Sequence, residues 1–151
     1  MGNDPDFEVA ARETGELIAR NGITLVYGGA QVGLMGAVAN SALAAGGEVI
    51  GVTPRGLWAD GVDHPGLTEL IEVDSMHDRK RRMSELADAF VALPGGIGTL
   101  EELVEMLTWA QLGLHGKPVG IVNVDASCQG QSAGTGIVTP SPRSRTCPRV
   151  G

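Results

Sequence analysis

A glycine-rich loop carries the strongest chemical signal in this sequence: the run 94–102 reads PGGIGTLEE. It follows the apolar run AFVAL and is expected to open a helix. Glycines let the main chain approach a phosphate closely, and the free N–H groups of a helix start bind anions. The Thr99 hydroxyl is expected to cap this helix. The candidate phosphate-binding residues are Gly95, Gly96, Gly98 and Thr99. Taken alone, such a loop is equally consistent with a tight turn that binds nothing.

Two common phosphate-binding motifs do not fit. A P-loop requires Gly-Lys-Ser/Thr, which neither glycine-rich loop of the chain contains. The dinucleotide pattern GxGxxG fits Gly96 and Gly98, but Glu101 stands where the third glycine belongs. Because a carboxylate repels a phosphate, Glu101 or Glu102 is expected to face a sugar instead.

A second candidate segment is the basic run 76–83, MHDRKRRM. A guanidinium suits a phosphate or a carboxylate, which it binds through paired hydrogen bonds. Helical spacing puts Arg79, Arg82 and Met83 on one face and directs Lys80 elsewhere. A solvated basic helix face is the usual interpretation of such a run on its own.

The third segment, 27–36, reads YGGAQVGLMG and again joins an apolar strand to a helix through glycines. Gly28 and Gly29 are its candidate binding residues. Two helix starts able to bind anions in one small domain suggest a nucleotide site between them. Simple packing of a tight strand-to-helix turn explains this segment equally well when it is taken singly.

The elements that must position these residues alternate along the chain. Helices are expected over 6–21, 34–45, 76–86 and 100–112, and strands over 23–27, 49–52, 70–73, 89–93 and 118–124. That order predicts an α/β fold with parallel strands and crossover helices.

Composition narrows the classes of function. The 151 residues predict one domain, and the formal net charge of -7 disfavours non-specific nucleic-acid binding. The two cysteines form no CxxC pair, so no zinc or redox motif is indicated. No signal peptide is recognisable, and no apolar run approaches the roughly 18 residues of a membrane span. A cytoplasmic protein without membrane contact is expected.

The pairing of SMHDRK, 75–80, with PGGIGTLEE resembles the LONELY GUY family. These are cytokinin riboside 5′-monophosphate phosphoribohydrolases, often mislabelled as lysine decarboxylases. VYGGAQVGLMG, VIGVTPRGL and TWAQLGLHGKPVGIVNVD are also similar to family segments, so the resemblance covers about residues 2–125. It implies a Rossmann-like three-layer fold, a parallel sheet with helices on both faces. It also implies a homodimer or larger assembly, no metal and no cofactor.

The implied reaction is hydrolysis of the N-glycosidic bond of a purine nucleoside 5′-monophosphate, adenine or cytokinin-type, to free base and ribose 5-phosphate. By resemblance Arg79 and Glu102 are the catalytic pair, and Met76, Lys80 and Glu101 are binding positions. Bond cleavage builds positive charge on the ribose, which a carboxylate such as Glu102 can stabilise. A non-catalytic nucleotide-binding module and an inactive fragment are the alternatives. A lysine decarboxylase is disfavoured, because neither lysine, Lys80 or Lys117, has a Schiff-base context.

Both ends depart from the family pattern. Family members begin with an additional strand, and here residues 2–7 resemble the segment that follows it. The domain 1–125 is therefore expected to lack that strand, leaving a gap between ITLVY and AFVAL and a poorly soluble chain. Residues 126–151 are rich in Ser, Gly, Thr and Pro and carry three arginines without an acid. They are expected to form a disordered or out-of-frame tail.

Overall fold

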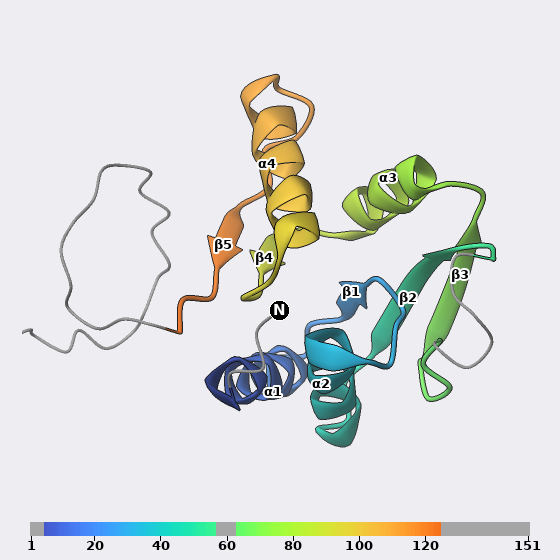
Figure 1. Cartoon of the computed structure of the whole chain (residues 1–151), viewed down its shortest axis with the longest axis vertical. Helices are drawn as coiled ribbons and strands as arrows, with labels where there is room; N and C mark the ends of the chain where they lie inside the picture. The colour runs from blue at the N-terminus through green and yellow to red at the C-terminus, as the bar shows by residue number, and fades with distance from the viewer. Residues whose placement is uncertain (1–4, 57–62, 125–151) are drawn as a thin grey trace, which may run out of the picture.

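The computed structural model describes residues 5–56 and 63–124. Helices and strands alternate along the chain as expected from the sequence (Figure 1). Their order is α1 (Pro5–Arg20), β1 (Leu25–Tyr27), α2 (Gly33–Ala44), β2 (Val49–Pro54), β3 (Glu69–Val73), α3 (Met76–Leu86), β4 (Phe90–Ala92), α4 (Ile97–Gln111) and β5 (Val119–Ile121). The predicted α/β class is confirmed, and most element ends differ from the expected ones by one or two residues.

The strands are parallel and fall into two separate sheets. One has the order β1-β2-β3 and the other pairs β4 with β5. Val26 lies opposite Ile50 in the first sheet, and Val91 lies opposite Gly120 in the second. β1 and β4 are thus end strands of different sheets, and they are not hydrogen-bonded to each other.

Small side chains build the core, as a chain with 3% aromatic residues requires. α1 and α2 lie against each other, and a Cβ added at Gly15 of α1 would overlap the carbonyl oxygen of Val38 in α2. The absence of a side chain at Gly15 therefore sets this close approach. The fully buried side chains Val49 and Val52 of β2 lie at the centre of the first sheet.

Some expectations fall outside the part of the chain that the structure describes. The tail expected over 126–151 lies there entirely, as do residues 1–4 at the start of the domain. Within the described residues, no helix combines the length and the apolar character needed to span a membrane.

Candidate active site

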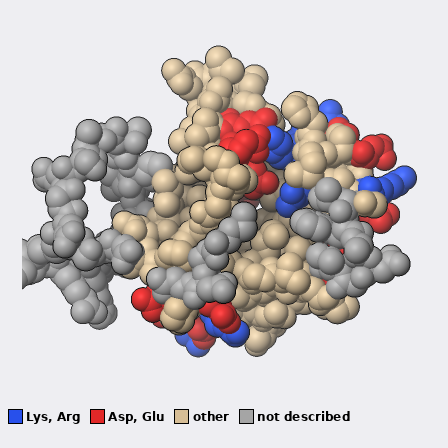
Figure 2. Space-filling view, in the orientation of Figure 1, with Lys and Arg blue, Asp and Glu red and all other residues tan. Residues whose placement is uncertain are grey.

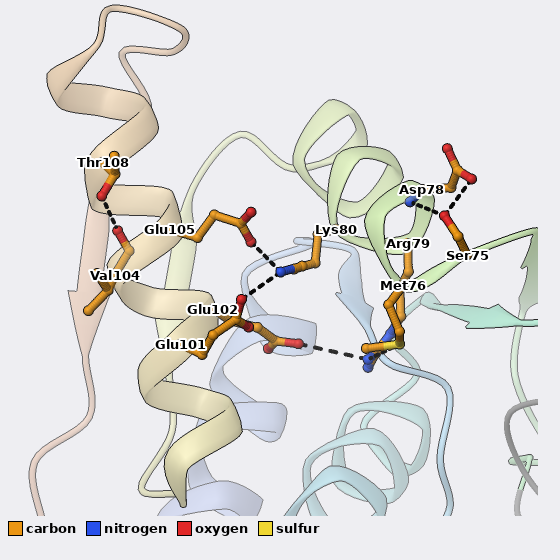
Figure 3. A network of polar contacts seen from close by, with 10 residues as sticks. All are labelled: Ser75, Met76, Asp78, Arg79, Lys80, Glu101, Glu102, Val104, Glu105 and Thr108. Carbon is orange, nitrogen blue, oxygen red and sulfur yellow. Dashed lines mark hydrogen bonds and ion pairs between the residues drawn. The ribbon is translucent and has the colours of Figure 1, made fainter.

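The start of α3 is fixed by a side-chain cap. Ser75 stands at the N-cap in extended backbone, and its Oγ accepts a hydrogen bond from the Asp78 N–H at 3.0 Å. The same hydroxyl donates to Asp78 Oδ2 at 2.7 Å (Figure 3). A cap of this kind stabilises a helix start by roughly 1 kcal/mol. It places Arg79 in the first turn, facing the first sheet.

Arg79 is buried, with 7% of its surface exposed, which is unusual for a charged side chain. Its Nε donates to the carbonyl oxygen of Val52 at 3.1 Å, and its Nη1 lies 3.8 Å from Met76 Sδ. On the other side the guanidinium lies against Gly28, where an added Cβ would overlap Nη2. The carboxyl ends of β1 and β2 therefore hold this guanidinium in one position.

Arg79 faces the first helical turns of α4. Its Nη1 is 3.8 Å from Oε1 of Glu102, and the two side chains are 8% and 42% exposed. The carboxylate is thus accessible to a ligand, while the guanidinium supports it from the interior. The sequence-based pairing of Arg79 with Glu102 corresponds to a real juxtaposition across two helices (Figure 3).

Lys80 joins α3 to α4 through two carboxylates. Its Nζ lies 2.7 Å from Glu101 Oε1 and 2.6 Å from Glu105 Oε2. The hydrogen bonds to Glu101 and then Glu105 raise the pKa of Lys80 above its ordinary value. Figure 2 shows these acidic side chains of α4 gathered beside basic groups of α3. Since Lys80 is engaged by both carboxylates, it aligns the two helices that carry Arg79 and Glu102.

The expected grouping of α3 side chains is wrong for two residues, Lys80 and Arg82. Arg79, Lys80 and Met83 line the same cavity, whereas Arg82 is exposed and pairs with Glu85 at 3.2 Å. The reason is that α4 approaches α3 from the Lys80 side, which the spacing within α3 alone does not reveal.

The start of α4 also differs from the expectation. The helix begins at Ile97, and its N-cap is Gly96, without any side-chain cap. Thr99 is therefore inside the first turn and does not cap the helix. Its side chain packs so closely on Gly95 that a Cβ there would overlap the Thr99 hydroxyl.

The glycine-rich loop still offers free main-chain N–H groups at the start of α4, the feature that made it a candidate phosphate site. The first intrahelical bond of α4 runs from the Leu100 N–H to the carbonyl of Gly96 at 3.2 Å. The N–H groups of the residues between them have no acceptor within the helix. Gly95, Gly96 and Gly98 are exposed, so an anion can reach these donors.

Some of the candidate site residues line one cavity of about 280 Å³. The candidate residues in its lining are Gly28, Arg79, Lys80, Thr99 and Glu102. Five further candidates are close to these residues in sequence but outside the lining: Met76, Gly95, Gly96, Gly98 and Glu101.

Gly29 also lies outside the cavity lining. It is buried at φ +84, its carbonyl accepts the His64 N–H at 3.0 Å, and it packs on Gly51. Of the two candidate glycines in the segment 27–36, only Gly28 therefore lines the cavity.

Sequence reasoning missed Glu105 and the close contact of Gly28 with Arg79. Glu105 follows Glu101 by one helical turn, and that spacing places both carboxylates on the same side of α4. The spacing was visible in the sequence, but the lysine that both carboxylates bind comes from another helix. Among the described residues, His, Cys, Asp and Glu side chains form no group suited to a metal ion.

The chain matches, over residues 35–128, a protein family described as "Possible lysine decarboxylase". It is 51% identical over 142 residues to a cytokinin riboside 5′-monophosphate phosphoribohydrolase of Rhodococcoides fascians, covering 89% of this chain and 72% of the relative. It is 50% identical over 124 residues to the cytokinin riboside 5′-monophosphate phosphoribohydrolase LOG of Oryza sativa subsp. japonica, covering 82% of this chain and 51% of the relative. The chain thus spans about half the length of the rice relative.

The fold also resembles solved structures. The molybdenum cofactor binding protein of Rippkaea orientalis superposes with a TM-score of 0.66 at 28% identity, covering 78% of this chain and 68% of that one. The molybdenum cofactor carrier protein of Chlamydomonas reinhardtii gives a TM-score of 0.64 at 28% identity, covering 78% and 67%.

Proposed function

Because this chain belongs to the LONELY GUY family of cytokinin riboside 5′-monophosphate phosphoribohydrolases, we propose that it hydrolyses the N-glycosidic bond of a purine nucleoside 5′-monophosphate. The products are the free base and ribose 5-phosphate. The observation that carries the proposal is the 3.8 Å approach of buried Arg79 to half-exposed Glu102. A site that only binds an anionic ligand has little use for a carboxylate beside its cation.

In the proposed reaction the glycine-rich start of α4 binds the 5′-phosphate. The exposed glycines and the first-turn N–H groups supply donors without a bulky side chain. This fixes the ribose near Glu102, which lies in the second turn of the same helix.

Glu102 acts on the sugar. As the bond from C1′ to the base breaks, positive charge builds on the ribose, and the carboxylate stabilises that charge. Water adds its oxygen to C1′, and its proton leaves through the carboxylate to the departing base. Arg79 keeps Glu102 oriented, because its own position is fixed by Val52 and Gly28.

The test is incubation of the full chain with AMP and with isopentenyl-AMP, followed by chromatography for free base and an assay for ribose 5-phosphate. We expect equimolar release of both products from at least one substrate, and the ratio of the two rates gives the base preference. Binding of both nucleotides without any release of base would refute the hydrolase.

A binding module without catalysis is the second candidate. It is favoured by the similarity to structures named as molybdenum cofactor carrier or binding proteins. It predicts saturable nucleotide binding with no turnover, and loss of Glu102 would then leave turnover at zero and change only affinity.

We further propose a homodimer, with α4 in the interface. Apolar side chains recur along α4 at helical spacing and are exposed: Ile97 76%, Leu100 53%, Val104 50% and Leu107 38%. A stripe of this kind can pack on its own copy about a two-fold axis. Light scattering after size exclusion should give twice the chain mass, and Leu100→Arg should give a monomer. The cytoplasmic location remains a prediction, testable by cell fractionation.

A further inference from the structure

Met76, the first residue of α3, holds its sulfur against the guanidinium of Arg79. Arg79 Nη1 lies 3.8 Å from Met76 Sδ and 3.8 Å from Oε1 of Glu102 in α4 (Figure 3). One nitrogen is therefore shared between a thioether and the carboxylate that the proposed reaction uses.

The thioether is the weaker of these two acceptors. A neutral sulfur accepts hydrogen bonds poorly, whereas the Glu102 carboxylate is a strong acceptor. The Nε bond to Val52 and the close contact with Gly28 hold the rest of the guanidinium. A direct ion pair needs its nitrogen and oxygen within about 4 Å. At 3.8 Å, a small displacement of Nη1 toward Met76 is enough to break the pair with Glu102.

Met76 is also accessible to reagents in solution. It is 42% exposed, whereas Met106 is buried at 8%, and Met35 and Met83 are half-buried. Met76 lies outside the lining of the cavity of about 280 Å³, so a reagent reaches its sulfur without entering that cavity. Because a methionine is oxidised where an oxidant can reach the sulfur, Met76 is the first described methionine expected to react.

We propose that Met76 is a reversible oxidation site, and that its sulfoxide draws Arg79 away from Glu102. The oxidant is a hydroperoxide. A lone pair of Sδ attacks one peroxide oxygen, and the S–O bond forms as the O–O bond breaks. With hydrogen peroxide, the departing hydroxide takes the proton of the transferred oxygen and leaves as water. The sulfur loses two electrons, and the peroxide gains them.

The new oxygen is a polar acceptor on the atom that already faces Arg79 Nη1. The flexible Met76 side chain lets this oxygen reach Nη1 at ordinary hydrogen-bond length, which is shorter than the contact made by the sulfur. Nη1 then moves toward Met76 and out of range of Glu102. A misplacement of about 1 Å at a reaction centre can lower turnover by about 10²-fold. This consequence rests on the hydrolase proposed above.

The first test treats the full chain with hydrogen peroxide, which is then removed by desalting. Peptide mass spectrometry should find the added oxygen on Met76 before it appears on Met83 or Met106. The kcat for release of base from AMP or isopentenyl-AMP should fall by about tenfold or more, and methionine sulfoxide reductase with a thiol reductant should restore it. Each variant is compared with itself before treatment. Met76→Leu should show no fall, whereas Met83→Leu should respond as the unaltered chain does.

The side chain of Arg79 gives a second readout that needs no turnover. In a chain whose arginines carry a heavy nitrogen isotope, the Nη resonances of Arg79 are identified by their loss in Arg79→Lys. They should shift when Met76 is oxidised, while those of Arg82, which pairs with Glu85, should not. A chain that releases no base should still show this shift, so failure of the hydrolase and failure of this inference are distinguishable. Oxidation of another described methionine before Met76, an unchanged Arg79 resonance, or an active chain with unchanged kcat after Met76 is oxidised would overturn the proposal.

Discussion

The guanidinium of Arg79 occupies the place where Gly28 would carry a side chain. A Cβ at Gly28 would overlap Nη2 of Arg79, so no residue larger than glycine fits at position 28 while Arg79 holds this position. Gly28 leaves space for the cation that supports Glu102.

We predict that Gly28→Ala displaces Arg79 and lowers turnover by about 10²-fold, the effect of misplacing a catalytic group by about 1 Å. Gly116→Ala is the matched control, because a Cβ there has nothing within 4 Å and its backbone is not at positive φ. The measurement is kcat for base release with circular dichroism of both variants. Unchanged turnover in Gly28→Ala would show that the position of Arg79 is not critical.

Glu102→Gln should lower kcat by about 10²- to 10⁴-fold with little change in stability, because the side chain is 42% exposed and the amide has the same shape. Glu69→Gln, at an exposed position of β3, serves as control and should keep full activity. A Glu102→Gln variant with near-parental kcat removes this residue from the mechanism.

Arg79→Ala should abolish turnover and also destabilise the fold, by about 1–3 kcal/mol, because it leaves a buried carbonyl at Val52 unpaired and empties buried space. Denaturant unfolding monitored by circular dichroism measures the loss. A variant as stable as the unaltered chain would contradict the buried position of Arg79.

Lys80→Met should reduce turnover and destabilise by about 2 kcal/mol, since Glu101 and Glu105 lose the cation that ties α4 to α3. Arg82→Met is the matched control on the same helix. Its ion pair with Glu85 is exposed, so its loss should cost roughly 0–1 kcal/mol and leave kcat unchanged. Equal effects of the two substitutions would show that Lys80 is only a surface charge.

Tyr27, the chain's single tyrosine, gives a clean pH readout. Burial, and secondarily the negative charge of Asp63, raises its pKa from 10.0 to about 12. Because the pKa of Tyr27 is higher in the folded chain, its contribution to the free energy of unfolding is fully present below pH 10. That contribution is lost as pH rises from 10 to about 12, and the total loss is about 3 kcal/mol. Absorbance at the phenolate band should titrate near 12 in the native chain and near 10 in denaturant.

Tyr27→Phe separates this effect from other alkaline titrations. Its hydroxyl has no hydrogen-bond partner among the described residues, so the substitution should be close to neutral at pH 7. Between pH 10 and 12 the variant should lose less stability than the unaltered chain. A tyrosine that titrates near 10 in the folded chain would show that Tyr27 is accessible to water.

Local chemistry was enough to predict the elements. The strand in the apolar run 23–27 and the helix over 76–86 follow from residue type and spacing, which act over a few residues. The start of α4 was misplaced because Gly96 takes the N-cap position, and a glycine there gives little sequence signal compared with Thr99.

The sequence by itself determined the alternating order of helices and strands. It also pointed to the glycine-rich loop as a candidate anion site and, through the family resemblance, to Arg79 and Glu102 as a candidate pair. These follow from spacing within one segment and from motifs that stay together along the chain. Only the tertiary structure decided that Lys80 binds Glu101 and Glu105 and that Gly28 makes room for Arg79. Each of these joins segments far apart in sequence, and their distance and direction are set by how helices and strands pack, which no local pattern encodes.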